Sequence, residues 1–461
     1  MTLTCVAGLG VSGTAVARLL AGRGEPVVVV EAVDGERQRI VAAELERLGA
    51  EVRFGPIELP EGVTRLITTG WAPHHPLIAA ALERDVEVVG EVELAWRLRG
   101  HDPAPWLALT GTNGKTTVVR MLTSMLAAAG HKALAVGNVG VPVVQAVADP
   151  YDVLAVELSS FQLHWSSSLA PHAAAILNVA PDHLDWHGSL EEYAAAKAKI
   201  FQRAGTVVYN ADDPAATALA DPYQGAVGFT LGVPRPGQVG VVEDLLVDRA
   251  FVADPAHAAE ELAGLGDVRP FAPHNVANAL AAAALARAYG VPPEAVRQGL
   301  LDFVPDPHRM SHVDRLDGVD YVDDSKATNL HAAAASLAAY PSIVWIAGGQ
   351  LKGADQADIG DLVTRAAPRL RGAVLLGADR ARVAEALARH APDVPVVDID
   401  GQDTGVMDRV VAEAAGLAAP GDTVLLAPAA ASLDMFAGYP ARGEAFARAV
   451  RELKGRGEPA T

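Results

Sequence analysis

The segment WLALTGTNGKTT (residues 106–117) joins an apolar, strand-like run to a glycine-rich turn, and a helix-like run follows at Val118–Ala129. In this order, successive backbone N–H groups of the turn form a nest for anions, and the helix begins beside it. Lys115 is placed to neutralise the β- and γ-phosphates of a nucleoside triphosphate, and Thr116 to ligate Mg²⁺. The sequence therefore predicts a phosphate loop that comprises Gly111, Thr112, Asn113, Gly114, Lys115, Thr116 and Thr117.

This loop is a variant, because Leu109 stands where the general pattern has glycine. A chance Gly-Lys-Thr with a purely structural role is the alternative. The strand before the loop and the helix after it, each on the side that phosphate binding requires, favour the nucleotide site.

Strand-like runs alternate with Ala- and Leu-rich helical stretches along the whole chain. Several of these runs are apolar at consecutive positions, which is typical of strands covered on both faces of a parallel sheet. The runs lie at Cys5–Ala7, Val27–Glu31, Trp106–Thr110, Val153–Glu157, Ala173–Asn178, Val319–Val322, Ile343–Ala347, Ala373–Leu376 and Thr423–Ala427. The fold class expected is α/β.

Three domains are expected from the length of 461 residues and from two Pro-containing polar stretches. These stretches lie at Gly100–Pro105 and Val304–His308. We therefore predict a Rossmann-like domain at 1–101, a P-loop ATPase-like domain with a mainly parallel sheet at 102–304, and a second Rossmann-like domain at 305–461.

The formal net charge of −19 argues against a general binder of nucleic acid or anionic membranes. The single cysteine, Cys5, excludes an internal disulfide and is expected to be buried. No apolar run reaches the roughly 18 residues that a membrane span requires. A cytoplasmic protein without membrane insertion is expected.

A second glycine-rich turn, Gly8-Leu9-Gly10-Val11-Ser12-Gly13, follows the first strand. Its N–H groups can approach a diphosphate at a helix N-terminus, and Glu31, at the end of the next strand, can accept hydrogen bonds from a ribose or a base. The motif by itself fits a nicotinamide or flavin cofactor, another nucleotide diphosphate, or a structural turn.

Acidic and imidazole side chains follow two strands of the predicted central sheet. Glu157 ends a strand beside the phosphate loop, so it is a candidate metal ligand, although a solvated strand-end acid is the alternative. The loop after the strand at Ala173–Asn178 contains Asp182, His183, Asp185 and His187. A metal or phosphate role is expected for at least one of these four, and their spacing does not choose which.

The segments 111–117, 137–140, 157–163, 178–187 and 193–199 together resemble the ATP-binding domain of the Mur ligase family. The resemblance implies that Glu157 and His183 bind Mg²⁺, that Asn138 belongs to the active site, and that Lys197, not Lys199, is carbamylated by CO₂. It places Asn275 and Asn278 near the adenine, whereas by position alone either asparagine would be a helix cap.

For the last domain, the resemblance assigns Arg309 and Lys326 to the ATP phosphates and Asp324 to the ribose. The residues that it assigns to the incoming amino acid are Thr328, Lys352, Ser432, Leu433 and Tyr439.

The same resemblance makes the N-terminal turn a site for the diphosphate of a UDP-sugar, so that no hydride chemistry is needed. The residues expected at this substrate are Gly10, Val11, Ser12, Gly13, Glu31, Gly70, Asn138, Ser159 and Gln162. Thr68-Thr69-Gly70 departs from the Ser-Pro-Gly that is common in the family, which puts the uracil and sugar contacts in doubt.

The segments 8–13, 157–163 and 432–434 together resemble those of the member that adds D-glutamate. The activity implied is ATP-dependent addition of D-glutamate to UDP-N-acetylmuramoyl-L-alanine through an acyl phosphate, a step of peptidoglycan precursor synthesis, by a monomer with Mg²⁺. Two other classes stay open at this point: a nicotinamide-dependent oxidoreductase and an ATP-driven switch without ligation.

Overall fold

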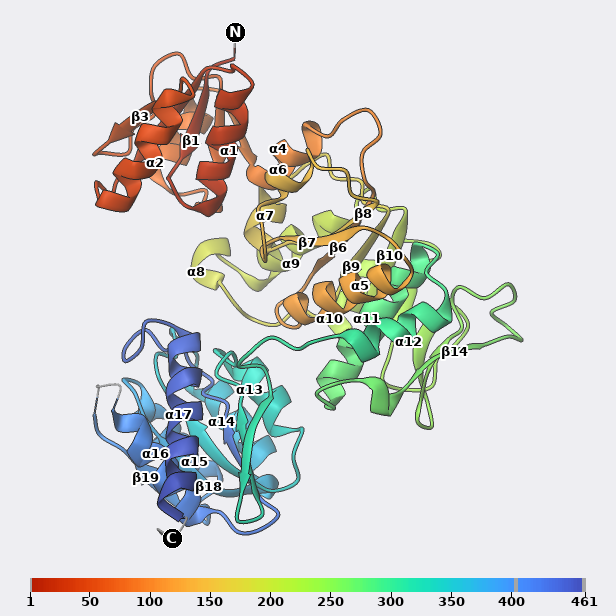
Figure 1. The fold of residues 1–461 in the computed structure, drawn as a ribbon, viewed down its shortest axis with the longest axis vertical. Coiled ribbons are helices and arrows are strands. Elements are labelled where there is room, and N and C mark those ends of the chain that lie inside the picture. Colours follow the sequence, from red (N-terminus) through yellow and green to blue (C-terminus); the bar gives the residue numbers. More distant parts are fainter. Residues whose placement is uncertain (1, 402–404, 458–461) are drawn as a thin grey trace. The chain divides into compact units, whose positions relative to one another are not determined.

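The computed structural model describes residues 2–401 and 405–457, and their strands form three separate sheets (Figure 1). Residues 2–268 and 276–303 make up one compact unit, and residues 269–275, 304–401 and 405–457 belong to a second. The first unit contains two of the sheets and the second unit contains the third.

The first sheet has five parallel strands in the order β3-β2-β1-β4-β5. Its elements are β1 (Thr4–Ala7), α1 (Val11–Gly22), β2 (Val27–Glu31), α2 (Glu36–Arg47), β3 (Glu51–Phe54), β4 (Arg65–Thr68), α3 (Pro76–Glu83), β5 (Glu87–Gly90) and α4 (Glu91–Arg97). Because all strands run the same way, their carboxyl ends lie along one edge of the sheet.

The second sheet has nine strands in the order β14-β13-β12-β11-β10-β9-β6-β8-β7. Its strands are β6 (Trp106–Thr110), β7 (Ala133–Gly137), β8 (Val153–Glu157), β9 (Ala173–Ile176), β10 (Thr206–Asn210), β11 (Val227–Phe229), β12 (Gln238–Val242), β13 (Leu245–Asp248) and β14 (Glu260–Gly264). The helices of this part are α5 (Lys115–Ala128), α6 (Val143–Ala146), α7 (Ser160–His164), α8 (Leu184–His187), α9 (Leu190–Ala198), α10 (Pro214–Ala220), α11 (Pro273–Ala288) and α12 (Pro293–Asp302), with 3₁₀ turns η1 (Lys199–Phe201) and η2 (Leu265–Asp267).

The third sheet has six strands in the order β15-β16-β20-β17-β18-β19. Its elements are β15 (Ser311–Leu316), β16 (Val319–Asp323), α13 (Leu330–Leu337), β17 (Ile343–Ala347), α14 (Gln356–Ala366), η3 (Ala367–Arg369), β18 (Leu370–Leu375), α15 (Arg380–His390), β19 (Val396–Asp398), α16 (Val406–Leu417), β20 (Thr423–Leu426) and α17 (Tyr439–Gly457).

The expected α/β class and the mainly parallel central sheet are confirmed, because antiparallel pairing is limited to sheet edges. It occurs at β12–β13–β14 and at β15–β16. The sequence analysis did not anticipate the β12–β14 extension. The expected strand at Ala173–Asn178 is too long: β9 ends at Ile176, and the next residues turn towards the phosphate loop.

Both faces of β6 are buried, as its unbroken apolar run predicts. Trp106 and Ala108 belong to one hydrophobic core, and Leu107 and Leu109 belong to another on the opposite face. The first of these cores also contains residues of α1 and α4, so the first two sheets share buried apolar surface. This shared core holds the carboxyl edge of the first sheet against the central part.

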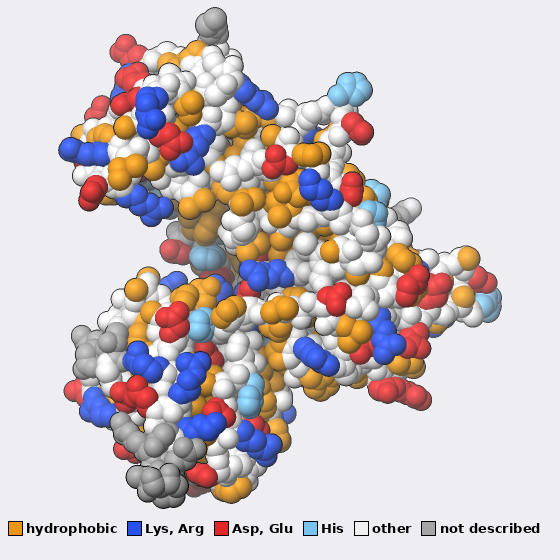
Figure 2. Space-filling view, in the orientation of Figure 1, with side chains coloured by type: hydrophobic (Ala, Val, Ile, Leu, Met, Phe, Trp, Pro, Cys, Tyr) orange, Lys and Arg blue, Asp and Glu red, His pale blue; other side chains and the backbone are white. Residues whose placement is uncertain are grey.

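The surface carries acidic and basic side chains intermixed over the visible face (Figure 2). Among the described residues, no helix combines the length and the apolar character that crossing a membrane requires. The lone cysteine is fully buried in the first sheet, and burial raises the pKa of its thiol to about 12.

Gly299 in α12 lies close against α5 in the central part. A Cβ at this position would lie 2.4 Å from Cα of Met125 in α5, where the main chain cannot move aside. We expect Gly299→Ala to destabilise the first unit by about 1–3 kcal/mol through overpacking. Calorimetry should show its unfolding transition lowered by several degrees.

Gly22 is a matched control, because a Cβ there meets no atom within 4 Å and the residue is also helical. Gly22→Ala should leave the transition unchanged or raise it slightly. Equal effects of the two substitutions would contradict the close packing of α5 against α12.

Candidate functional site

The phosphate loop lies between β6 and α5, with Gly114 as the residue before the helix. Gly114 has φ +85°, and a Cβ there would lie 2.4 Å from Oδ1 of Asn278, so glycine is required on both counts. Lys115 Nζ donates to the carbonyls of Gly111 and Thr112 at 2.8 Å each. The ammonium group is therefore held against the loop by the loop's own carbonyls.

Hydrogen bonds from the loop after β9 hold the phosphate loop in place. Asn178 Oδ1 accepts from the N–H of Asn113 at 2.8 Å, and its Nδ2 donates to the carbonyl of Asn113 at 3.1 Å. The hydroxyl of Thr112 lies 3.0 Å from that of Tyr193 and accepts from the N–H of Ala180 at 3.0 Å. The sequence analysis gave no individual role to Asn178 or Tyr193, although both begin segments that resemble the Mur ligase family, 178–187 and 193–199.

Glu157 ends β8 beside this loop and is 1% exposed. Its Oε1 accepts from Nδ2 of Asn138 at 2.9 Å, and its Oε2 has no hydrogen-bond partner among the residues that the structure describes. A buried carboxylate oxygen without a partner is costly unless it meets a proton or a cation. Glu157 therefore fits a divalent cation held between the protein and phosphate oxygens.

His183 is exposed, and its Nε2 lies 3.6 Å from Oδ2 of Asp182. His187 is buried instead, with Nε2 2.9 Å from the hydroxyl of Ser160, and burial lowers its pKa to about 4. Of the two histidines, His183 is the one that can reach a ligand. The described residues contain no cluster of three or more His, Cys, Asp or Glu, so a cation here would need phosphate oxygens or water as further ligands.

Lys197 is 1% exposed, although its sequence context is that of a solvated helix lysine. Its Nζ donates to the carbonyl of Gly111 at 2.9 Å and to Thr110 Oγ1 at 3.4 Å, and it lies 4.5 Å from the ring centre of Tyr193. Burial, together with the charge of Lys115, lowers the pKa of Lys197 well below its ordinary value. The neutral amine is thus favoured beside the phosphate loop.

Asn275 and Asn278 lie within α11, which begins at Pro273, so the plain interpretation of either as a helix cap is wrong. Asn278 approaches Gly114 in the first unit. Asn275 Nδ2 donates to the carbonyl of Pro270 at 3.0 Å.

The N-terminal turn is built as its glycines predict. Gly8 has φ +87°, and a Cβ on Gly13 would lie 2.1 Å from the carbonyl oxygen of Gly8. Gly10 precedes α1, which places the N–H groups of Val11 and Ser12 at the helix start. Glu31 accepts from the N–H groups of Leu9 and Val33 at 2.7 and 2.8 Å, so its carboxylate also braces the turn.

A cleft in the first unit brings together residues that the sequence analysis placed at one substrate. Its lining includes Ser12, Gly70 and Gln162, together with Thr69, Glu91 and Phe161. Ser159 and Gln162 form a reciprocal cap at the start of α7, in which Ser159 Oγ and Gln162 Oε1 each accept a backbone hydrogen bond. Asn138 lies beside Glu157 at the phosphate site.

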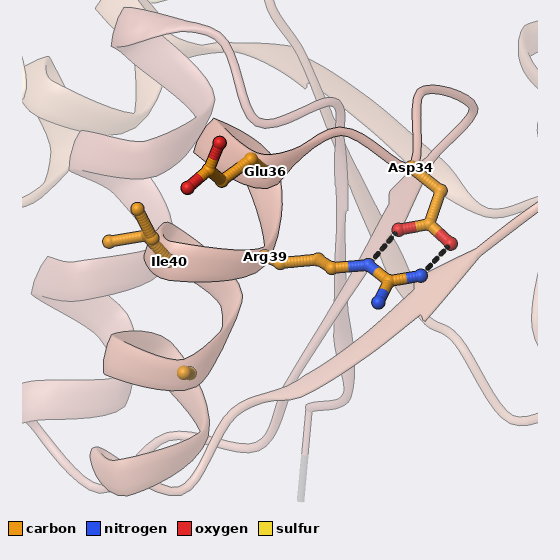
Figure 3. Close-up of a pocket in the computed structure, with 5 residues that line it drawn as sticks. Asp34, Glu36, Arg39 and Ile40 are labelled. Atoms are coloured by element: carbon orange, nitrogen blue, oxygen red, sulfur yellow. Dashed lines mark hydrogen bonds and ion pairs between the residues drawn. The ribbon is translucent and has the colours of Figure 1, made fainter.

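A second depression lies on the surface of α2 and is lined by Asp34, Glu36, Arg39, Ile40 and Ala43 (Figure 3). Arg39 bonds both carboxylate oxygens of Asp34, at 2.6 and 2.8 Å. Both side chains are exposed, so this pair contributes little and is screened by salt. We therefore place the candidate site at the cleft and the phosphate loop.

In the second unit, polar loops follow the carboxyl ends of β16, β17 and β20. Asp324, expected at a ribose, is buried, accepts from the N–H of Met310 at 3.2 Å and bonds the hydroxyl of Ser336. Burial raises its pKa to about 6. Lys326 Nζ lies 3.9 Å over the ring of Tyr439, and Arg309 pairs with Asp306 at 3.7 Å.

The remaining amino-acid candidates occupy the same loops. Lys352 is exposed in a left-handed conformation with φ +47°, Ser432 is 3% exposed, and Leu433 is 66% exposed. Thr328 lies in the loop after β16. These loops therefore carry a cationic, an apolar and two hydroxyl side chains.

Arg442 in α17 joins these three loops and was not assigned a role from sequence. It is 1% exposed, and its guanidinium donates to the carbonyl of Ser325 at 2.9 Å and of Ala430 at 3.1 Å, and to Gly348 at 3.4 Å. Burial lowers its pKa to about 10, which leaves it charged at neutral pH.

Two family models match the chain: the Mur ligase middle domain at residues 109–286 and the Mur ligase glutamate ligase domain at residues 308–430. A UDP-N-acetylmuramoylalanine–D-glutamate ligase of Thermobifida fusca is 63% identical, with 98% of each chain covered. The ligase of the same name from Streptomyces avermitilis is 62% identical, with 97% of each chain covered.

Among solved structures, a UDP-N-acetylmuramate-alanine ligase of Thermotoga maritima matches with a TM-score of 0.59 at 18% identity, over 99% of this chain and 100% of that one. A pseudomurein peptide ligase type C of Methanothermus fervidus gives a TM-score of 0.58 at 18% identity, with the same coverage. At this identity, the two structures support the fold alone.

The buried amine of Lys197 makes stability depend on pH. The unfolded chain binds the lysine proton up to its ordinary pKa of 10.5, and the folded chain releases it at lower pH. Between these two pKa values the unfolded state holds more protons, so wild-type stability rises with pH in this window. Lys197→Met removes the contribution of this amine to the pH dependence of stability. The thermal midpoint of the variant should therefore rise less steeply with pH than that of the wild type.

Calorimetry in CO₂-free buffers from neutral pH to about pH 10, near the ordinary lysine pKa, measures this difference. Identical slopes for the wild type and Lys197→Met would show that the amine is not held neutral in the fold.

Proposed function

This chain belongs to the Mur ligase family, and we propose that it is the ATP-dependent ligase that adds D-glutamate to UDP-N-acetylmuramoyl-L-alanine in peptidoglycan precursor synthesis. The observation that carries the proposal is the phosphate loop with Lys115, together with Glu157, whose buried Oε2 has no hydrogen-bond partner among the residues that the structure describes. An oxidoreductase needs neither of these features.

The reaction proposed has two balanced steps. A carboxylate oxygen of the alanyl group attacks the γ-phosphorus of ATP, which forms an acyl phosphate and releases ADP. The amine of D-glutamate then attacks the acyl carbon, loses a proton, and phosphate leaves. Negative charge develops at phosphoryl oxygens, where Lys115 and the N–H groups of the loop stabilise it.

Mg²⁺ fits the donor groups beside the loop. The hydroxyl of Thr116, Oε2 of Glu157 and the imidazole of His183 would hold it, with phosphate oxygens completing the set. When bound, the ion neutralises phosphoryl charge.

We also propose that Lys197 reacts with CO₂. The neutral amine forms a bond to carbon and releases one proton, which gives a carbamate. The burial of Lys197 and the lowered pKa of its amine support this modification, because only the neutral amine adds CO₂. The carbamate would supply a further anionic ligand for Mg²⁺.

We also propose contacts for the nucleotide sugar, for ATP and for D-glutamate. The N-terminal turn, Glu31 and Gly70 bind the UDP part, with Asn138, Ser159 and Gln162 towards the sugar. The residues proposed for ATP beyond the loop are Asn275, Asn278, Arg309, Asp324 and Lys326, and those for D-glutamate are Thr328, Lys352, Ser432, Leu433 and Tyr439. Asp324 would contact a ribose only through lone pairs not used by Met310 and Ser336.

We propose three domains for this activity: Rossmann-like domains at 1–101 and 305–461 flanking a P-loop domain at 102–304. The parallel order β3-β2-β1-β4-β5 of the first sheet supports the first of these assignments. We also propose that the protein acts in the cytoplasm and as a monomer.

The purified chain should release phosphate from ATP with Mg²⁺ and UDP-N-acetylmuramoyl-L-alanine only when D-glutamate is also present. Phosphate release without an amino acid would favour an ATP-driven switch.

Lys115→Ala should lower ligation by about 100-fold or more, because the loop loses its cation. Lys132→Ala, an exposed lysine over Tyr151, is the control and should stay active.

Lys197→Ala should be inactive, and added short carboxylates such as formate should restore part of the activity by occupying the place of the carbamate. Lys199→Ala is the matched control, because Lys199 donates to the carbonyl of His164 away from the phosphate loop. It should keep its activity and gain nothing from carboxylates. An active Lys197→Ala enzyme would refute the carbamate.

A further inference from the structure

Glu91 is the first residue of α4 and follows directly after β5. It therefore lies at the carboxyl edge of the first sheet, beside the end of β4. Ligands of parallel α/β sheets bind at this edge. Neither the sequence analysis nor the proposed mechanism gives Glu91 a role.

The two carboxyl oxygens of Glu91 have different surroundings. Oε1 accepts from the N–H of Val144 at 2.7 Å, which joins α4 to α6. Oε2 is buried and has no hydrogen-bond partner within the described part of the chain, and the whole residue is 3% exposed. An unpartnered buried oxygen is unfavourable unless a ligand satisfies it.

Glu91 lines the same cleft as Ser12, Gly70 and Gln162, which are proposed to bind the nucleotide sugar. Ser12 lies in the first turn of α1, where a diphosphate is expected, and Gln162 belongs to the central part. Glu91 therefore lies at the junction between the diphosphate end and the sugar end of the proposed site.

Glu93 is the natural comparison, because it is two residues further along α4 and fully buried. Its oxygens accept from the N–H groups of Ser167 and Ser168, from the hydroxyl of Ser168 and from Arg97. Glu93 is thus satisfied by the protein, whereas Glu91 is only half satisfied. A structural role accounts for both oxygens of Glu93 but leaves Oε2 of Glu91 unexplained.

We propose that Glu91 binds the nucleotide-sugar substrate, with its protonated Oε2 donating a hydrogen bond to an oxygen of the diphosphate–sugar linkage. The inference rests on the proposed function, because that function supplies the ligand. A diphosphate is an anion that accepts hydrogen bonds and repels an ionised carboxylate, so the donor must be the neutral acid.

The environment of Glu91 favours this neutral form. Burial raises the pKa of its carboxyl to about 7, and the hydrogen bond from the backbone N–H of Val144 offsets only part of the rise. An approaching diphosphate favours the protonated form further, because a nearby negative charge disfavours the ionised carboxylate.

Isothermal titration of UDP-N-acetylmuramoyl-L-alanine into the full chain, without ATP or amino acid, tests the contact directly. Glu91→Leu should weaken binding by about 10-fold or more, since one charge-assisted hydrogen bond is lost. Glu91→Gln should bind within about threefold of the wild type, because the amide keeps an acceptor for Val144 and a donor in place of Oε2–H.

Glu93→Leu is the matched control and should lower thermal stability without changing the affinity for the nucleotide sugar. In steady-state assays, Glu91→Leu should raise KM for the nucleotide sugar while KM for ATP and for D-glutamate stays constant. Unchanged affinity in Glu91→Leu, with lowered stability as in Glu93→Leu, would reduce Glu91 to a helix contact and overturn the inference.

Infrared difference spectroscopy on the wild type and Glu91→Gln covers the case in which the leucine variant fails to fold. Binding of the nucleotide sugar should shift a carboxylic-acid C=O band that is absent from Glu91→Gln, and a band that is the same in both proteins overturns the inference. A wild-type chain that does not bind the nucleotide sugar overturns the proposed function and this inference together, whereas wild-type binding that Glu91→Leu preserves overturns only the inference.

Discussion

The hydrogen bonds that hold residues 111–113 against the loop after β9 are the constraint on which the phosphate site depends. A glycine-rich turn has many accessible conformations, and ordering it costs conformational entropy. Asn178 bonds both the N–H and the carbonyl of Asn113, and Lys197 bonds the carbonyl of Gly111. On the other side of β6 lies β8, whose last residue, Glu157, pairs with Leu109 just before the turn.

Buried polar groups lie near the carboxyl edges of all three sheets. Glu157 and Glu91 each keep one oxygen without a partner in the described chain, and Lys197 is held in a place that disfavours its charge. Arg442 shows the opposite solution, in which a buried cation is satisfied by carbonyls from three loops. Groups satisfied by the protein order the loops, and groups left unsatisfied are suited to a ligand.

The loop Thr68-Thr69-Gly70, which departs from the family pattern, has its own supports. Without a proline to restrict the backbone, the loop is held by two indole groups of the central part. Trp186 Nε1 donates to the carbonyl of Gly70, and Trp165 Nε1 donates to the carbonyl of Trp71, each at 3.0 Å. Trp186 lies in the same short segment as His183. Its hydrogen bond therefore ties the loop of Gly70 to the loop after β9.

The sequence by itself determined the α/β class, the phosphate loop and most strands, because each depends on neighbouring residues: an apolar run, a glycine turn and a following helix. Only the tertiary structure decided the environment of Lys197, Arg442 and Glu91. Lys197 bonds a carbonyl 86 residues away, and Arg442 bonds one 117 residues away. Burial and pKa follow from such distant partners, and local sequence patterns carry no information about which segments pack together.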